Sequence, residues 1–477
     1  MGRCLTLNQQ LPHQTFRADI GRRLQAGAPL LIAAFFLLLI LPPVFRILFA
    51  GMPTGGTGAV IRLLQRPAVY KSIAFSLTQA GISAAISVLL ALPGAYFISH
   101  IQFRGRKIIQ SLTLLPFVLP SLIVILAVIS LYGRNGLLGG LLGSKSSLVY
   151  SPLGIILAHV MFNLAVALRI LSTGWQAVDD TLCNVSRSLG ERFSQRLLNL
   201  DLPLLLPSLL SAFSIVFLYC LVSFGVVLVF GGIRYSTMEV RIYQEMFQHL
   251  NLQNAAWLAI LQILVAGSVI FLLQFFTRHT ARRNGTGIQL TPWKQLRTMQ
   301  QAAIAGYWLF IAVIVLLPLA ALIFRAFRAG GWNVDAFTAV FGLVQNRRLQ
   351  DIMRASFPEI LASSLGIATI TALFCTIAAY LAAALLRGKR TPGIDTLLVL
   401  PLAISGVTIS LGMRLLWHSI IPTSLLVAGT QAIMAFPMVF KLMRTAFNDF
   451  PIAYSEAAQS TGASRFFRLH SLHIPML

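Results

Sequence analysis

Charged residues are scarce in this chain, and acidic ones are the scarcest. Of 477 residues only 10% are charged, and Asp and Glu number 13 against 37 Lys and Arg. Soluble globular chains carry about 25% charged residues, so this chain has too little polar surface to face water. With 57% hydrophobic residues and a mean hydropathy of +0.80, it is predicted to be an all-α polytopic membrane protein.

Cysteine is also sparse, and its spacing excludes two kinds of site. The four cysteines are scattered and form no C-x-x-C pair, which argues against a zinc site and a disulfide framework. The histidines show no metal-ligand spacing, so we expect neither a metal nor a cofactor. The net charge of +24 comes from basic residues in short loops between apolar runs. This placement indicates membrane orientation rather than nucleic-acid binding.

Ten apolar runs are long enough to cross a bilayer, which takes roughly 20 mostly apolar residues as a helix. Basic residues gather before the first run and in alternate loops, around 104–107, 187–196, 278–297 and 387–390, and are sparser in the other loops apart from 347–354. This alternation predicts a multi-pass protein of the inner (cytoplasmic) membrane with a cytoplasmic N-terminus. The runs lie near 28–48, 72–98, 108–132, 152–172, 205–230, 254–276, 303–325, 361–386, 394–416 and 422–443.

The chain also repeats itself. The stretches that begin at Ser76 and Ser364 both read as Ser-Leu, an apolar span, a short basic loop and a second span that opens on Leu-Pro. We therefore expect two tandem repeats in the same orientation. The predicted domains are 1–71 (tail, first span and outer loop), 72–276 (first repeat), 277–302 (cytoplasmic linker), 303–360 (a span and an outer loop) and 361–477 (second repeat).

The most informative motif lies near the end of the chain. It reads Glu456-Ala457-Ala458, with Gly462 four residues later and Pro475 further on. Small alanines allow close helix approach, and a glycine permits a turn after a helix. The motif resembles the EAA loop of ATP-binding-cassette (ABC) importer permeases. The resemblance implies two short helices that dock on a cytoplasmic ATPase subunit, and two tandem permease repeats in an importer of type I architecture.

The matching loop of the first repeat, 179–207, keeps part of this motif. Its glycine and proline have the same spacing as in the second copy, but Asn184 stands where the second copy has the glutamate. The resemblance implies that this copy docks on the ATPase without that acidic side chain. Its candidate coupling residues are Asn184, Ser186, Gly190 and Pro203.

Further stretches resemble the fused, two-half permeases for thiamine and for ferric iron. They are LYGRNGLLG from Leu131, GIILAHVMFNLAVALRIL from Gly154, SFGVVLVFGG from Ser223 and TMEVRIYQEM from Thr237. The resemblance implies thiamine import, with ferric iron as the alternative substrate. It also implies a dimeric ATPase and a periplasmic or lipoprotein solute-binding protein as partners, in contact with membrane lipid and not with nucleic acid.

The resemblance also raises the question of completeness. Fused permeases of this type have twelve spans, whereas the predicted spans number ten and the chain stops at Leu477, inside the second EAA loop. We therefore expect the second repeat to be truncated, and the chain as given not to support transport.

Two polar residues within a predicted span are candidates for the transport pathway. His159 and Asn163 are four residues apart and so share a helix face. They either line the pathway or hydrogen-bond to a neighbouring helix, and the second interpretation is favoured. An ion-coupled secondary transporter is the alternative from another class, but the lack of acidic residues within spans argues against it. Because no nucleotide-binding motif occurs, ATP hydrolysis is expected on a separate subunit and this chain is not expected to be an enzyme.

Overall fold

The computed structural model describes residues 65–139, 149–178, 180–232, 234–278, 290–328, 356–386, 392–399 and 406–449, with short pieces within 38–49, 338–341, 401–404 and 458–462. These residues are overwhelmingly helical, as the composition predicts. The chain separates into two compact units, Ala50–Pro358 and a second unit made of Met1–Phe49 together with Glu359–Leu477. Each is described by itself.

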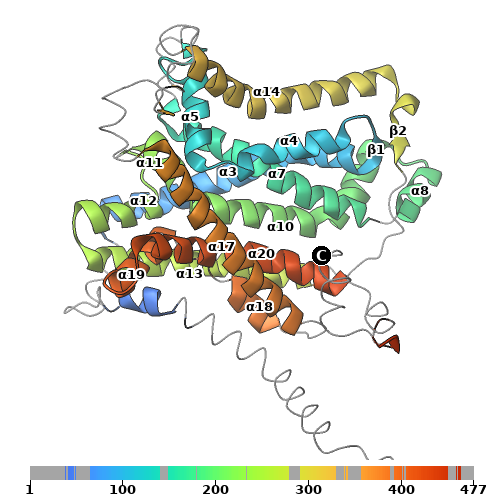
Figure 1. Cartoon of the computed structure of the whole chain (residues 1–477). Helices are drawn as coiled ribbons and strands as arrows, with labels where there is room; N and C mark the ends of the chain where they lie inside the picture. The colour runs from blue at the N-terminus through green and yellow to red at the C-terminus, as the bar shows by residue number, and fades with distance from the viewer. Residues whose placement is uncertain are drawn as a thin grey trace, which may run out of the picture. The chain divides into compact units, whose positions relative to one another are not determined.

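The first unit is built around three long helices that pack side by side, α3, α7 and α10 (Figure 1). Apolar residues cover nearly all faces of these helices, as expected for helices that are surrounded by other helices and by lipid. Between α3 and α7 the chain forms two shorter helices, α4 and α5. The bounds are Pro67–His100 for α3, Arg106–Val118 for α4, Ser121–Tyr132 for α5, Pro152–Gln176 for α7 and Leu202–Leu221 for α10.

Two short helices and a π-helical turn lie between α10 and the next long helix, α13. One of them, α11, packs into an apolar cluster between α5 and α7 that includes Val128, Met161 and Phe230. The other, α12, contacts α3 and α13. The segment thus closes one end of the three-helix core. The bounds are Gly225–Gly231 for α11, Met238–Tyr243 for α12, Gln244–Gln248 for the π-helix η3 and Leu252–Arg278 for α13.

Helix α14 (Thr298–Arg328) belongs to this first unit, where it packs mainly on α5. The linker before it is attached at the opposite end: strands β1 (Ile101–Gln102) and β2 (Thr291–Pro292) pair in parallel, and a 3-10 turn, η4 (Trp293–Gln295), follows β2. Nearer the middle, the Tyr307 hydroxyl donates to the Leu90 carbonyl at 2.7 Å. Pro93, three residues further along α3, supplies no backbone donor to that helix.

The second unit shows the same order of elements as the first. A long helix, α17, is followed by two short ones, α18 and α19, and then by a long one, α20. This matches α3, then α4 and α5, then α7, and agrees with the repeat predicted from the sequence. The bounds are Phe357–Leu385 for α17, Pro392–Val399 for α18, Gly406–Trp417 for α19 and Thr423–Asp449 for α20.

Three predicted spans differ from the structure. The span predicted at 108–132 bends by 102° between α4 and α5, because Leu119 before Pro120 adopts an extended conformation. The span predicted at 394–416 is two short helices with Pro401 between them. In the described residues seven helices are long and apolar enough to cross a membrane, or eight with the bent pair. The predicted span 28–48 lies mostly outside the described residues.

The third difference is a span that starts and ends earlier than predicted. The helix expected at 205–230 ends at Leu221, whereas the continuous apolar helix begins at Ser194. Hydropathy does not reveal the end of the helix at Leu221, because α11, which follows it, is apolar and buried as well.

Candidate coupling site

The loop predicted to couple the first repeat to an ATPase forms a helix, a tight turn and a second helix. Helix α8 (Asp180–Ser188) is followed by a turn at Gly190, whose φ is +79°. The Glu191 N–H donates to the Ser186 carbonyl at 3.2 Å, which is the bond that closes a glycine-terminated helix. The Ser186 hydroxyl donates to Glu191 Oε2 at 2.5 Å and holds the turn from the side-chain direction. The short helix α9 (Phe193–Arg196) follows.

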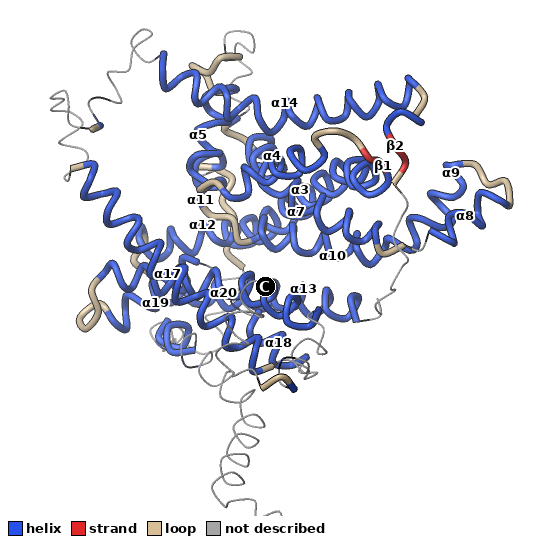
Figure 2. The backbone as a smooth tube through the Cα atoms, turned by 45° about the vertical axis from the view of Figure 1, so that its right-hand side comes forward, coloured by secondary structure: helices blue, strands red, loops and turns tan. Residues whose placement is uncertain are grey.

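One face of α8 carries exposed apolar side chains. Leu182, Val185 and Leu189 are exposed by 38%, 52% and 77%. They are spaced three and four residues apart, so they form a stripe along the helix and its terminal turn. Asn184, which stands in the position of the motif's glutamate, is also exposed. In Figure 2, α8 and α9 extend sideways beyond the end of α10.

A buried ion pair joins this loop to α10. Arg196 Nε lies 3.2 Å from Asp201 Oδ2, and the two side chains are only 5% and 1% exposed. Both residues flank or belong to a π-helical stretch, η2 (Leu197–Asp201), that runs directly into α10. Pro203 sits in the first turn of α10. Proline supplies no N–H for the usual helical hydrogen bond, and this explains the π-helical turn η2 directly before α10.

The second coupling loop is described only in part. Gly462 has a φ of +79°, equal to that of Gly190, and the Thr461 hydroxyl donates to the Ala458 carbonyl at 3.0 Å. Both loops therefore turn on a glycine in the left-handed region, which other residues rarely adopt. Glu456, Ala457 and Pro475 lie outside the described residues.

The two candidate pathway residues lie inside the packing of the first unit. His159 and Asn163 are 2% and 4% exposed. His159 Nδ1 lies 3.3 Å from the Ser83 hydroxyl, and Asn163 Nδ2 lies 3.4 Å from Cys220 Sγ. These contacts join α7 to α3 and to α10, so within this unit both side chains make interhelical hydrogen bonds.

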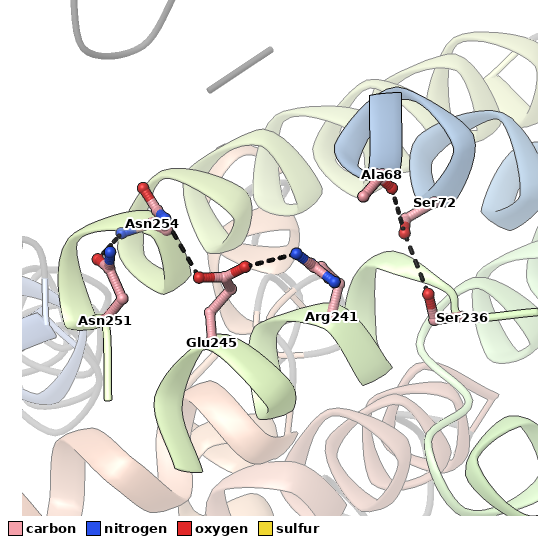
Figure 3. Close-up of polar contacts among 7 residues, drawn as sticks. All are labelled: Ala68, Ser72, Ser236, Arg241, Glu245, Asn251 and Asn254. Atoms are coloured by element: carbon pink, nitrogen blue, oxygen red, sulfur yellow. Dashed lines mark hydrogen bonds and ion pairs between the residues drawn. The ribbon is translucent and has the colours of Figure 1, made fainter. Parts of the chain in front are cut away.

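At the end of α3 away from the coupling loop the structure reveals a polar network whose pairings the sequence did not predict (Figure 3). Arg241 Nη2 pairs with Glu245 Oε1 at 2.8 Å, and Asn254 Nδ2 donates to the other oxygen of that carboxylate at 3.1 Å. Beside it, Gln262 Nε2 donates to Glu239 Oε2 at 2.8 Å. The two carboxylates are 1% and 3% exposed. The sequence signal for this network was the presence of two acidic residues, Glu239 and Glu245, in a short segment between apolar helices.

The segment just before α12 and the start of α12 also make hydrogen bonds to α3. The Ser72 hydroxyl donates to the Ala68 carbonyl at 2.9 Å and lies 3.2 Å from the Ser236 hydroxyl (Figure 3). One turn later the Met238 N–H donates to the Ser76 hydroxyl at 2.7 Å. In the part of the chain that the structure describes, no group of three or more His, Cys, Asp or Glu side chains could hold a metal ion.

Residues 81–286 match the family described as the binding-protein-dependent transport system inner membrane component. The chain is 28% identical over 426 residues to the thiamine transport system permease protein ThiP of Brucella abortus (strain 2308), which covers 84% of this chain and 74% of the relative. It is 28% identical over 424 residues to ThiP of Escherichia coli (strain K12), covering 85% and 75%.

A solved structure also matches. The crystal structure of a bacterial ABC transporter involved in the import of the acidic polysaccharide alginate is 18% identical, with a TM-score of 0.46. The match covers 56% of this chain and 100% of that chain.

Proposed function

We propose that this chain, which resembles ABC importer permeases over most of its length, forms the membrane pathway of a thiamine importer driven by a separate ATPase. The resemblance predicted from the sequence is confirmed by the family match and by the thiamine permeases among the relatives. The names of those relatives support thiamine as the cargo, and the description of the matched family supports a solute-binding protein as a partner. None of the matches reported above favours ferric iron or an ion-coupled mechanism.

One observation supports the coupling mechanism above the others. Both repeats carry a loop that turns on a glycine with a φ of +79° at matching positions. In the first loop, the exposed stripe of Leu182, Val185 and Leu189 offers an apolar surface of the kind that helix-in-groove recognition uses. We assign this stripe to the groove of a cytoplasmic ATPase subunit. Exposed Asn184 lies beside it, without the charge that the second loop carries at Glu456.

The proposed mechanism is alternating access driven by the partner. ATP binding closes the ATPase dimer, and the coupling loops move with it. The buried Arg196–Asp201 pair and the π-helical turn then carry the motion of α8 and α9 into α10. The ATP-bound and ATP-free partner must differ in affinity for the two states of the permease, since a ligand shifts an equilibrium only by its differential affinity.

The orientation follows from the same proposal. If the coupling loops meet a cytoplasmic ATPase, then the N-terminus, the linker 277–302 and the ends of α3 and α14 joined by β1 and β2 are cytoplasmic. The network of Figure 3 lies at the outer end. Reporter fusions after Arg104 and after Arg283 should both report cytoplasm, and a periplasmic signal from either contradicts this topology.

The substrate is tested by reconstitution. A version of the chain extended through the downstream coding sequence is placed in lipid nanodiscs with its ATPase, and ATP hydrolysis is measured with a thiamine-loaded or ferric-loaded solute-binding protein. We expect stimulation by the thiamine-loaded protein alone. Stimulation by the ferric-loaded protein alone would assign iron, and hydrolysis that never responds to a binding protein contradicts the importer function.

A further inference from the structure

The linker that precedes α14 is fixed to the end of α3. Strand β1 follows α3 directly and pairs in parallel with β2 of the linker, a ladder so short that it is marginal by itself. Ring contacts reinforce it, because the centroid of Phe103 lies 6.3 Å from that of Trp293 and 6.5 Å from that of Trp308 in α14. The Gln301 side chain also donates to the Trp293 carbonyl at 2.9 Å. We call the β1–β2 pair with Phe103, Trp293 and Trp308 the linker clamp.

Aromatic side chains continue from the linker clamp across α3 to α7. The ring centroid of Trp308 lies 5.0 Å from that of Tyr307, which in turn lies 5.4 Å from that of Phe97 in α3. Phe97 adjoins Tyr96, with the ring centroids 6.1 Å apart, and the ring of Tyr96 lies 5.5 Å from that of Trp175 in α7. Aromatic rings attract one another over this range of separations. We call these residues the aromatic chain.

The aromatic chain ends at the base of the first coupling loop. Trp175 lies in the last turn of α7, and its carbonyl accepts the Val178 N–H at 3.0 Å in the turn that leads to α8. One turn earlier, the bond from Ser99 to the Ser172 carbonyl joins the ends of α3 and α7. Figure 1 shows β1, β2 and α8 at the same end of the first unit. Packed side chains therefore lead without a break from the linker to the coupling loop.

Anchoring in the membrane does not account for these aromatic residues. Tryptophan and tyrosine are enriched where a membrane protein meets the lipid headgroups, and rings with that role face lipid. The side chains of Trp175 and Trp308 are instead 2% and 9% exposed, so they face protein. A linker that only connects two repeats would not need them, since a flexible connection requires no fixed contacts.

We propose that the linker clamp is a positioning element of the first coupling loop. This role rests on the proposed function, which makes that loop the docking site of an ATPase subunit. The linker clamp and the aromatic chain hold the ends of α3 and α7 against α14, so the base of the loop is already in place when the ATPase arrives. A pre-organised loop loses less conformational freedom on binding, and this strengthens binding. The linker thus acts through its contacts and not through its covalent continuity.

The test is the affinity of the purified ATPase for the chain, extended through the downstream coding sequence, in lipid nanodiscs. Phe103→Leu removes the ring that meets Trp293 and Trp308 and should weaken binding about threefold to tenfold, which corresponds to the loss of aromatic pairing. Phe103→Tyr keeps the ring and should bind as the wild type does. The matched control is Phe224→Leu at the opposite end, whose ring pairs with Tyr243 at 5.1 Å, and it should also bind as the wild type does.

Cutting the linker separates contact from continuity. A protease site inserted after Arg283 allows the chain to be cleaved before β2, so that the linker clamp is kept while the connection is lost. The cleaved chain should bind the ATPase with the affinity of the intact chain. Cleaved Phe103→Leu should be as weak as intact Phe103→Leu.

The outcomes separate this role from the proposed function. Equal affinities for the wild type and Phe103→Leu would overturn the role of the linker clamp while the proposed function stands. An equal loss in Phe224→Leu would also overturn it, because the effect would then be general destabilisation. A loss on cleavage as large as that of Phe103→Leu would reduce the linker to a connection. If the wild-type chain never binds the ATPase, the proposed function itself fails.

Discussion

The two repeats make the same contact between their two long helices, α3 and α7 in the first and α17 and α20 in the second, with different residues. In the first repeat the Ser83 hydroxyl lies 3.3 Å from His159 Nδ1. In the second the Thr371 hydroxyl lies 3.5 Å from Gln431 Oε1. Counted back from the glycine of each coupling loop, His159 and Gln431 occupy the same position. The contact is therefore kept by position while its chemistry changes.

Nearer the coupling loops the repeats agree again in aromatic packing. The rings of Tyr96 and Trp175 lie 5.5 Å apart in an edge-to-face arrangement, and those of Tyr380 and Phe447 lie 5.3 Å apart. Such pairs contribute about 0.5–1.5 kcal/mol beyond the area they bury. Each links the helix that leads into a coupling loop to the first helix of its repeat.

The repeats differ in how they use charge. In the first, the Ser99 hydroxyl donates to the Ser172 carbonyl at 3.0 Å. In the second, Arg444 occupies the position of Ser172 and pairs with Asp395, Nε to Oδ1 at 3.4 Å. The first repeat places its buried ion pair after the coupling loop instead, at Arg196 and Asp201. Each repeat therefore has an ion pair near its coupling loop, after the loop in the first repeat and before the loop in the second.

The largest effect should come from breaking the ion pair of the first repeat. Arg196→Met or Asp201→Leu alone leaves a buried charge without its partner and should destabilise the chain by about 3–5 kcal/mol. The double variant should recover most of this loss. Unfolding in detergent measures it. At the matching positions the second repeat has arginine at 468 but histidine at 473, so it cannot form the same ion pair. A double variant as unstable as the single ones would contradict the pairing of Arg196 with Asp201 in the first repeat.

The next effect concerns Gly94, where the second repeat has Ala378. A Cβ at Gly94 would lie 2.4 Å from the Tyr307 hydroxyl and 2.8 Å from a Leu168 methyl. Gly94→Val should therefore cost about 1–3 kcal/mol through overpacking, and Tyr307→Phe should relieve part of it. Gly81→Val in the same helix is the control, because nothing lies within 4 Å of its Cβ. Equal melting temperatures for the two valine variants would contradict this packing.

A smaller effect should follow from Gly190. Its Cβ would meet nothing within 4 Å, so the cost of Gly190→Ala comes from the φ of +79° alone and should be about 1–2 kcal/mol. Asparagine tolerates this conformation better, so Gly190→Asn should lose less. ATPase affinity, measured by titration, should fall more for Gly190→Ala than for Gly190→Asn. Equal affinities for both variants would mean that the turn geometry does not govern docking.

The smallest effect should come from the paired hydroxyls. Double-mutant cycles on Ser83 with His159, and on Thr371 with Gln431, should each give a coupling of about 0.6 kcal/mol, the average for hydrogen bonds between membrane helices. Coupling in the first repeat and none in the second would limit the shared contact to the first repeat.

Long apolar runs and loop charge predicted most of the helices, because length and hydropathy are set locally. The bend at Pro120 and the break around Pro401 both coincide with a proline. Membrane helices also tolerate proline, so the sequence could not show whether these spans are continuous or broken. The glycine turn at 190 was predictable, since few other residues adopt a positive φ. The partners of Glu239 and Glu245 were not, because Gln262 and Asn254 meet them only after the chain folds back.

The most direct test of the coupling site is a photo-crosslink from an exposed side chain. A benzophenone amino acid is placed at Leu189, 77% exposed on the α8 turn, or at Leu250, 80% exposed at the opposite end. Membranes that contain the chain and its ATPase are irradiated and probed for the joined product. The coupling role of the α8 loop predicts an ATPase adduct from position 189 and none from 250. An adduct from neither position, or equal adducts from both, would contradict it.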